Sequence, residues 1–282
     1  MPPLTWSHGC NDLAKLDAAM RDAEVDAVEV DLAWNAALGT AVTKHASESD
    51  ETADEPMDKW LETLFEAEGG AVARRVRVLK LDFKSVRAMR PALDALARCL
   101  AAARASPPEA AEGRPLPEVW INGDVLDGPG GRKSFPNSRA GPPLDVGGFF
   151  AACAGWPDAV LSVGWTTDYR VTQALSYTDE HVSDMLAVLR EHGNGRRATF
   201  PIRASLFADS WPALRRLLEL PGSSLTLWSS TEGVPEEHLA LARRVVSESQ
   251  LYVDCDKGPR LAFYHPGRLL FYAAHVAGVS LQ

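Results

Sequence analysis

The segment VLKLDFK, residues 78–84, decides the fold prediction. It begins with the apolar residues of a buried strand and ends with two opposite charges, Asp82 and Lys84. The interior of a parallel sheet cannot hold such charges unpaired. Side chains two positions apart on a strand point to the same face, so these two should meet at one place. The segment therefore predicts a core strand that ends at a functional site.

Short apolar, β-rich runs of this kind recur along the chain, and most are followed by a helical pattern. The eight runs are 4–8, 27–32, 77–83, 118–123, 159–165, 198–204, 224–230 and 251–255. The clearest helical patterns are 86–103, 179–191, 211–218 and 235–247. Strand–helix alternation indicates a parallel sheet with right-handed crossovers. Eight strands in 282 residues favour one α/β domain, a single (β/α)8 barrel of the TIM type over residues 1–282, rather than an open sheet.

Helix starts and loops punctuate this pattern. Thr178 is expected to open one helix, and Ser210 to open another with Pro212 in its first turn. Three stretches, 46–56, 106–117 and 127–143, are expected to be mobile loops, because they are acidic or rich in Pro, Gly or Ala. The last of them follows the fourth strand, on the face where barrels carry their active sites, and it could be a lid.

Composition and charge exclude some classes of function and leave others open. A net charge of −9 argues against a broad nucleic-acid-binding surface. The four cysteines lie far apart without zinc spacing, which fits a reducing compartment. No leader precedes the first predicted strand, and the longest apolar run, from Leu269, is too short to span a bilayer. We therefore expect a cytoplasmic protein, whose oligomeric state the sequence leaves open.

Functional groups of a parallel barrel sit at the carboxyl ends of its strands. The charged residues at the ends of the first three strands are, in chain order, His8, Glu29 with Asp31, His45 just past the second strand, and Asp82 with Lys84. Each carboxylate pair or carboxylate–lysine pair is two residues apart and therefore shares one face. We expect these side chains to gather at the barrel mouth.

Three carboxylates at one place repel each other unless a cation or protons intervene. Glu29, Asp31 and Asp82 offer the hard oxygen ligands that suit Mg²⁺ or Ca²⁺. Lys84 would help to neutralise an anionic substrate, and two histidines suit acid–base or nucleophilic chemistry near neutral pH. The alternatives are ordinary: salt bridges explain most such carboxylate pairs, Asp82 and Lys84 could merely pair with each other, and His45 could be a solvated surface residue.

Further strand ends supply candidates for substrate binding: Asn122, Trp165, Arg203 and Trp228. Arg203 could clamp a phosphate through its planar fork or take part in a buried ion pair. Trp228 and Trp165 could form an apolar wall or simply pack at the top of the barrel. Asn122 could orient the substrate or fill a water site on the metal.

The order of a histidine, an ExD pair, a second histidine and a DxK pair resembles the phospholipase-C-like phosphodiesterase superfamily. That superfamily includes glycerophosphodiester phosphodiesterases and spider-venom sphingomyelinase D. A closer resemblance, to the menorin family, covers nearly the whole chain. It is carried by the blocks WSHGCND, AVEVDL, LKLDFKS, VWINGDVLDGPG, AVLSVGWTT, TFPIRAS and SLTLWSS.

The resemblance implies a TIM-type barrel with a divalent cation, usually Mg²⁺, on Glu29, Asp31 and Asp82. His8 and His45 would then be the catalytic pair, with Lys84 beside them, acting on a small or lipid phosphodiester such as a glycerophosphodiester or a lysophospholipid. The reaction would be hydrolysis or formation of a cyclic phosphate.

The chain departs from the diesterase pattern at two positions. Gly9 stands where those enzymes usually have Arg, and Ala46 stands where they usually have Asp. Two other functions therefore stay open: a non-catalytic binding or adhesion barrel that retains the pocket, and a nucleotide or RNA phosphodiesterase.

Overall fold

The computed structural model describes residues 4–45, 54–66, 75–105, 115–133, 135–138, 140–168, 175–229, 234 and 236–255. Its strands are β1 (Trp6–Ser7), β2 (Ala27–Asn35), β3 (Thr40–Thr43), β4 (Glu55–Pro56), β5 (Val78–Phe83), β6 (Glu118–Asp127), β7 (Val160–Thr166), β8 (Ala198–Arg203), β9 (Ser223–Trp228) and β10 (Leu251–Asp254). Its α-helices are α1 (Leu13–Arg21), α2 (Met57–Glu66), α4 (Val86–Ala105), α5 (Val146–Cys153), α6 (Asp179–His192), α7 (Phe207–Leu214) and α8 (Glu236–Val245).

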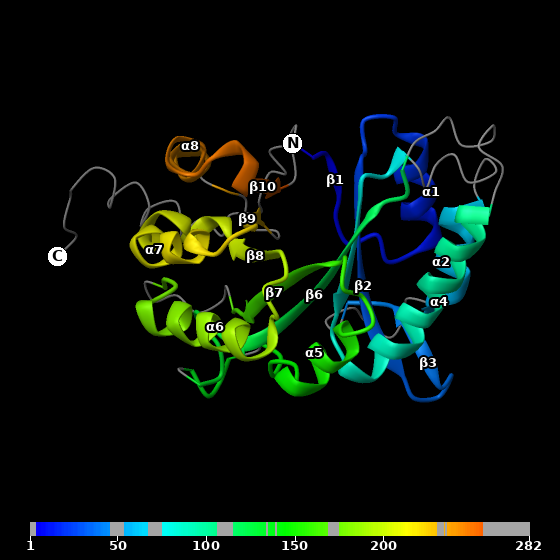
Figure 1. Ribbon diagram of the computed structural model, residues 1–282, viewed down its shortest axis with the longest axis horizontal. Coiled ribbons are helices and arrows are strands. Elements are labelled where there is room, and N and C mark those ends of the chain that lie inside the picture. The colour runs from blue at the N-terminus through cyan, green and yellow to red at the C-terminus, as the bar shows by residue number, and fades with distance from the viewer. Residues whose placement is uncertain are drawn as a thin grey trace, which may run out of the picture.

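Eight of these strands are parallel and follow one another around a curled sheet in the order β1, β2, β5, β6, β7, β8, β9, β10. All eight predicted strands are present, and helices lie between most of them, outside the sheet (Figure 1). The prediction of a single TIM-type α/β barrel is confirmed. An antiparallel extension, β3 and β4, is added to the end of β2.

Successive side chains along each strand point alternately outward and inward, and this produces two separate apolar cores. Residues such as Val30, Leu81 and Phe200 face outward, where they pack with the helices in the large core between helices and sheet. Residues of the opposite parity face inward, and at the amino-terminal end of the strands they form a small apolar floor around Trp120. Trp6 and Tyr252 pack on Trp120 with ring centroids 5.6 and 4.9 Å away. The inward residues nearer the carboxyl ends are polar, so the interior is apolar below and charged above.

The helix starts give one confirmation and one correction. Thr178 caps α6 and accepts a hydrogen bond from the backbone of His181, as the sequence predicts. Ser210 does not cap a helix. Helix α7 begins one turn earlier, at the buried Phe207, and Pro212 lies inside it. The Ser210 hydroxyl instead donates to Leu206 O and accepts from Tyr177 N. The predicted helix 211–218 therefore covers the end of α7 and the 3-10 helix 215–219 that follows.

The expected loops are only partly within the described residues. Residues 46–53 and 106–114 lie outside them. Residues 55 and 56 are a strand rather than a loop, because they pair with β3. In the stretch 127–143, Asp127 ends β6 and its carboxylate accepts hydrogen bonds from the backbone of Arg132 and Lys133. Whether this loop acts as a lid stays a prediction. Within the described part of the chain, none of the helices has the length and apolarity needed to cross a bilayer.

Candidate active site

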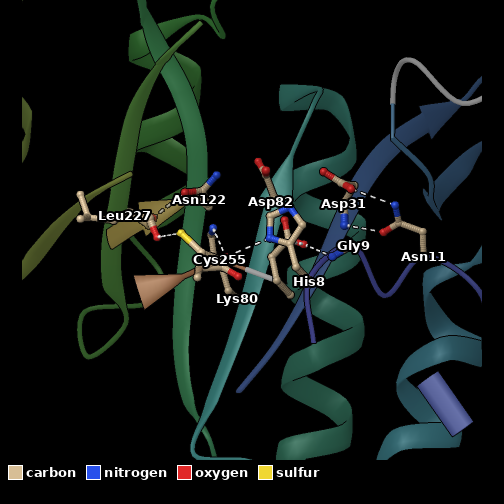
Figure 2. A network of polar contacts seen from close by, with 12 residues as sticks. His8, Gly9, Asn11, Asp31, Lys80, Asp82, Asn122, Leu227 and Cys255 are labelled. Atoms are coloured by element: carbon tan, nitrogen blue, oxygen red, sulfur yellow. Dashed lines mark hydrogen bonds and ion pairs between the residues drawn. The ribbon is translucent and has the colours of Figure 1, made fainter. Parts of the chain in front are cut away.

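The pairing of β2 with β5 brings the predicted carboxylates together. Asp31 lies directly beside Asp82 in the parallel ladder, and Glu29 lies one inward-facing position below Asp31. One oxygen from each of the three carboxylates lies within 4.8 Å of the others. Glu29 and Asp31 are buried and Asp82 is half-buried at the mouth. Figure 2 shows Asp31 and Asp82 side by side above His8.

Lys84 lies between two of these carboxylates. Its Nζ is 2.7 Å from Asp82 Oδ2 and 3.0 Å from Asp31 Oδ1. The backbone of Lys84 continues the ladder past the end of β5 by donating to Leu32 O. Burial disfavours the ammonium, but Asp31 and Asp82 more than offset this and raise the pKa of Lys84 well above its usual value. Lys84 is therefore a fixed positive charge within the acidic cluster.

Asp31 is held from the side of β1 as well. Asn11 Nδ2 donates to Asp31 Oδ2 at 2.8 Å, and Asn11 Oδ1 accepts from Asp31 N at 2.9 Å. Burial opposes ionisation of Asp31, but Lys84, His45 and the Asn11 amide more than offset this and hold its pKa below its usual range. A hydrogen bond from Lys44 N to Asp31 O fixes the chain just before His45. His45 follows directly, and its charge is one of the causes that lower the pKa of Asp31.

His8 lies near Glu29, at the lower end of the cluster. Its Nδ1 is 3.7 Å from Glu29 Oε2 and 2.9 Å from Asp254 Oδ2. The charge of Glu29, opposed by burial and reinforced by Asp254, raises the pKa of His8 to about 10. Burial in turn raises the pKa of Glu29 to about 7, against the positive charge of His8.

Gly9 accounts for the first departure from the diesterase pattern. Its φ is +58°, in the left-handed region that residues with a side chain rarely adopt. Its N–H donates to Glu29 Oε2 at 2.5 Å. An arginine at this position would strain the turn that connects His8 to Glu29, so the glycine here supports the carboxylate through the backbone.

Of the candidates for substrate binding, Asn122 lies next to the carboxylate cluster, whereas Arg203 and Trp228 pack on each other. Asn122 is buried, lies beside Asp82 in the ladder and accepts from Ser162 Oγ. The guanidinium of Arg203 lies over the Trp228 ring, 5.2 Å from its centroid, and Arg203 Nη1 donates to Thr167 Oγ1 at 3.4 Å.

Trp165 does not join the other candidates. Its side chain faces the large core outside the barrel, where it packs edge-on against Tyr177 and near Phe200. The inward position of that strand belongs to Gly164, where an added Cβ would meet the Asp124 carboxylate. The sequence placed Trp165 at a strand end correctly but on the wrong face.

Four polar residues of the site were missed: Asn11, Lys80, Asp124 and Asp254. Lys80 and Asp254 are each 2% exposed, and Lys80 Nζ lies 3.8 Å from Asp254 Oδ2. Burial raises the pKa of Asp124 to about 7, against the attraction of Lys84. Two of the four lie two residues from predicted site residues and therefore on the same inward face, Lys80 next to Asp82 and Asp124 next to Asn122, and this signal could have found them.

The donor set fits a divalent cation. The three carboxylates provide only oxygen atoms, close enough to contact one ion, and their mutual repulsion is only partly offset by Lys84. A hard cation would complete that charge balance. Glu29, Asp31 and Asp82 are the residues that would hold it.

Comparisons with known proteins agree with this architecture. The chain is 27% identical to human "Protein FAM151B" over 259 residues, which cover 89% of this chain and 82% of that protein. A crystal structure described as "a putative glycerophosphodiester phosphodiesterase from Galdieria sulphuraria" superposes with a TM-score of 0.51 and 12% identity, over 91% of this chain and 94% of the other. At that identity the likeness concerns the fold alone. The sequence profile of the menorin N-terminal domain matches residues 2–260, and the chain therefore belongs to the menorin family.

Proposed function

We propose that this protein is a metal-dependent phosphodiesterase that cleaves a small or lipid phosphodiester. The observation that supports this most is the carboxylate cluster: one oxygen from each of three acids within 4.8 Å of the others, on the inward face of two adjacent parallel strands. His8 lies beside Glu29, and His45 is close enough to Asp31 for its charge to lower the pKa of that carboxyl. Phosphoryl transfer needs positive charge for the phosphate oxygens and groups that move protons on opposite sides of the phosphorus.

The histidines would divide the proton transfers between them. One would attack phosphorus or activate the attacking hydroxyl, and the other would protonate the leaving alkoxide. His8 follows β1 and His45 follows β3, and in-line displacement would use them on opposite sides of the phosphorus. If the attacking hydroxyl belongs to the substrate, the product is a cyclic phosphate; if it belongs to water, the product is a monoester.

Charge stabilisation would come from two sources. A divalent cation on the three carboxylates, Mg²⁺ or Ca²⁺, would polarise the phosphoryl oxygens as a Lewis acid. Lys84 adds a second positive charge, which its two ion pairs fix in place before substrate arrives.

Recognition of the substrate would fall to Asn122, Arg203 and Trp228. The guanidinium of Arg203 suits an anionic headgroup, and the stacked Trp228 ring offers an apolar surface to a glycerol or lipid portion. Asn122, next to Asp82 in the ladder, is placed to orient a substrate oxygen.

The test is hydrolysis of a panel of phosphodiesters with and without Mg²⁺. We expect turnover that EDTA abolishes and that both His45→Ala and Asp82→Asn reduce by at least about 100-fold, the usual contribution of an acid–base group. His192→Ala is the matched control for the histidine, because His192 stacks on Phe150 away from the cluster. Asp58→Asn is the control for the carboxylate, since Asp58 forms an exposed ion pair with Arg98. Activity that survives both site substitutions rules this mechanism out.

The same assay separates the other two functions. Binding of the cation without turnover of any diester would support a binding or adhesion barrel. Turnover confined to nucleotide diesters would support a nucleotide phosphodiesterase. We also propose a cytoplasmic location, which cell fractionation would test.

A further inference from the structure

A buried ion pair lies beneath the carboxylate cluster, inside the barrel. Asp254 on β10 and Lys80 on β5 face each other there, with 3.8 Å between Oδ2 and Nζ, and both are almost completely shielded from solvent. Figure 2 shows Lys80 and His8 in one polar network. Replacing such a pair by apolar residues is often neutral or stabilising. Stability alone therefore does not explain a carboxylate at this depth.

The nearest partner of Asp254 is the catalytic candidate His8. The Asp254 Oδ2 to His8 Nδ1 distance of 2.9 Å is a hydrogen bond, whereas Glu29 Oε2 lies 3.7 Å from the same nitrogen. An imidazole has two ring nitrogens, and a bond at one of them fixes the ring orientation and selects the other for chemistry. With Nδ1 bound to Asp254, Nε2 is the nitrogen left for substrate.

The position of Asp254 is itself fixed where the two ends of the curled sheet meet. Among the described residues, β1 pairs only with β2 and β10 only with β9, and the hydrogen bond of His8 with Asp254 joins these two ends. Tyr252, two residues before Asp254 and on the same face, packs edge-on against Trp120, which also contacts Trp6 of β1. Lys80 holds the carboxylate from the neighbouring side. Asp254 is thus supported by the packed aromatic floor and by the Lys80 ammonium rather than by a loop.

We propose that Asp254 is the positioning residue of His8: it holds Nδ1 and thereby orients Nε2 toward the phosphodiester. Its effect on turnover rests on the proposed function, whereas its hold on the imidazole does not. Lys80 offsets the charge of Asp254, so that the carboxylate can remain buried next to His8.

The first experiment observes the ring directly. In protein labelled with 15N-histidine, NMR should show a slowly exchanging proton on Nδ1 of His8, assigned by its loss in His8→Gln. This proton should disappear in Asp254→Ala. It should persist in Tyr252→Phe, a control on the same strand and face that retains the aromatic packing. Since Asp254→Ala leaves Lys80 without its closest carboxylate and could unfold the chain, Asp254→Asn is the second variant, in which an amide oxygen can still accept the Nδ1 proton and the signal should remain.

The second experiment measures kinetics. Asp254→Ala should lower kcat by about 10- to 100-fold, the usual effect of removing the partner that orients a functional histidine, while KM and Mg²⁺ affinity stay unchanged. Formate, which can enter the gap left by the missing carboxylate, should restore part of the rate. A merely structural role would not give rescue by formate.

The outcomes separate the two proposals. An Nδ1 proton that is absent from the wild type, or that is unchanged in Asp254→Ala, overturns the positioning role. A kcat in Asp254→Ala equal to that of Tyr252→Phe overturns it as well. A wild type that hydrolyses no diester refutes the proposed function instead, and the ring proton still decides whether Asp254 holds His8.

Discussion

Replacing Lys84 by methionine tests whether this ammonium holds the acidic cluster together. In the wild type, Lys84 lies 2.7 Å from Asp82 and 3.0 Å from Asp31, with its side chain 22% exposed. Each contact at about 3 Å is worth roughly 5 kcal/mol at an effective dielectric constant of about 20, before the cost of desolvation is subtracted. Removing one partner of a buried pair typically costs about 3–5 kcal/mol. Because Lys84 keeps some contact with solvent, we expect the lower end, about 3 kcal/mol.

For a chain of this size, a loss of about 3 kcal/mol lowers Tm by roughly 6–12 °C. The assay is a thermal melt in EDTA, repeated with millimolar Mg²⁺. A cation bound to Asp31 and Asp82 would replace the lost positive charge, so Mg²⁺ should stabilise Lys84→Met by more degrees than it stabilises the wild type. The control is Lys133→Met, because Lys133 forms an exposed pair with Glu180 at 3.3 Å, and such pairs contribute less than about 1 kcal/mol.

Two results would refute this reasoning. A melt of Lys84→Met in EDTA that matches the wild type would mean that the carboxylates do not depend on the ammonium. Equal stabilisation of both proteins by Mg²⁺ would mean that the cation and Lys84 do not share the same acids.

Three further predictions concern the surroundings of the site. Asn11→Ala removes both hydrogen bonds to Asp31, and it should weaken Mg²⁺ binding by about 10- to 100-fold in calorimetry; unchanged affinity would contradict this. Trp120→Ala empties the barrel floor and should cost about 3–5 kcal/mol in urea denaturation, and a loss below 1 kcal/mol would show that the floor repacks. Burial raises the pKa of both Cys10 and Cys153 to about 12; the thiol stays protonated below the raised value, so both should resist a thiol reagent at pH 8 until the chain is unfolded, and rapid labelling of the native protein at either residue would contradict this.

The sequence predicts the barrel well because hydrophobic period and strand–helix alternation are local signals. The eight inner strands could be read one at a time, and their order around the barrel follows from parallel crossovers. The hairpin of β3 and β4 was not predicted, because its strands are short and one of them, Glu55–Pro56, has the composition of a loop.

The site was predicted less completely. A residue's place at the end of a strand fixes its position along the barrel axis, but it does not say whether its side chain points into the barrel or outward. Trp165 lies at the end of its strand but on the outward face, whereas Lys80 lies on the inward face between the apolar residues Leu79 and Leu81. Following the inward parity of VLKLDFK would have found Lys80 next to Asp82. The contact between Asp254 and His8 has no local signal, because it joins residues 246 positions apart.

That long contact has a consequence for synthesis of the protein. A ribosome makes β1 first and β10 near the end of the described chain, so a partly translated polypeptide carries His8 and Glu29 long before the residue that completes their surroundings. Contacts this distant in sequence form slowly, because closing so long a loop is entropically costly. The proposed chemistry at the barrel mouth therefore has to wait for the last strand, and a chain truncated before Leu251 would have the three carboxylates without the residue proposed to orient the imidazole.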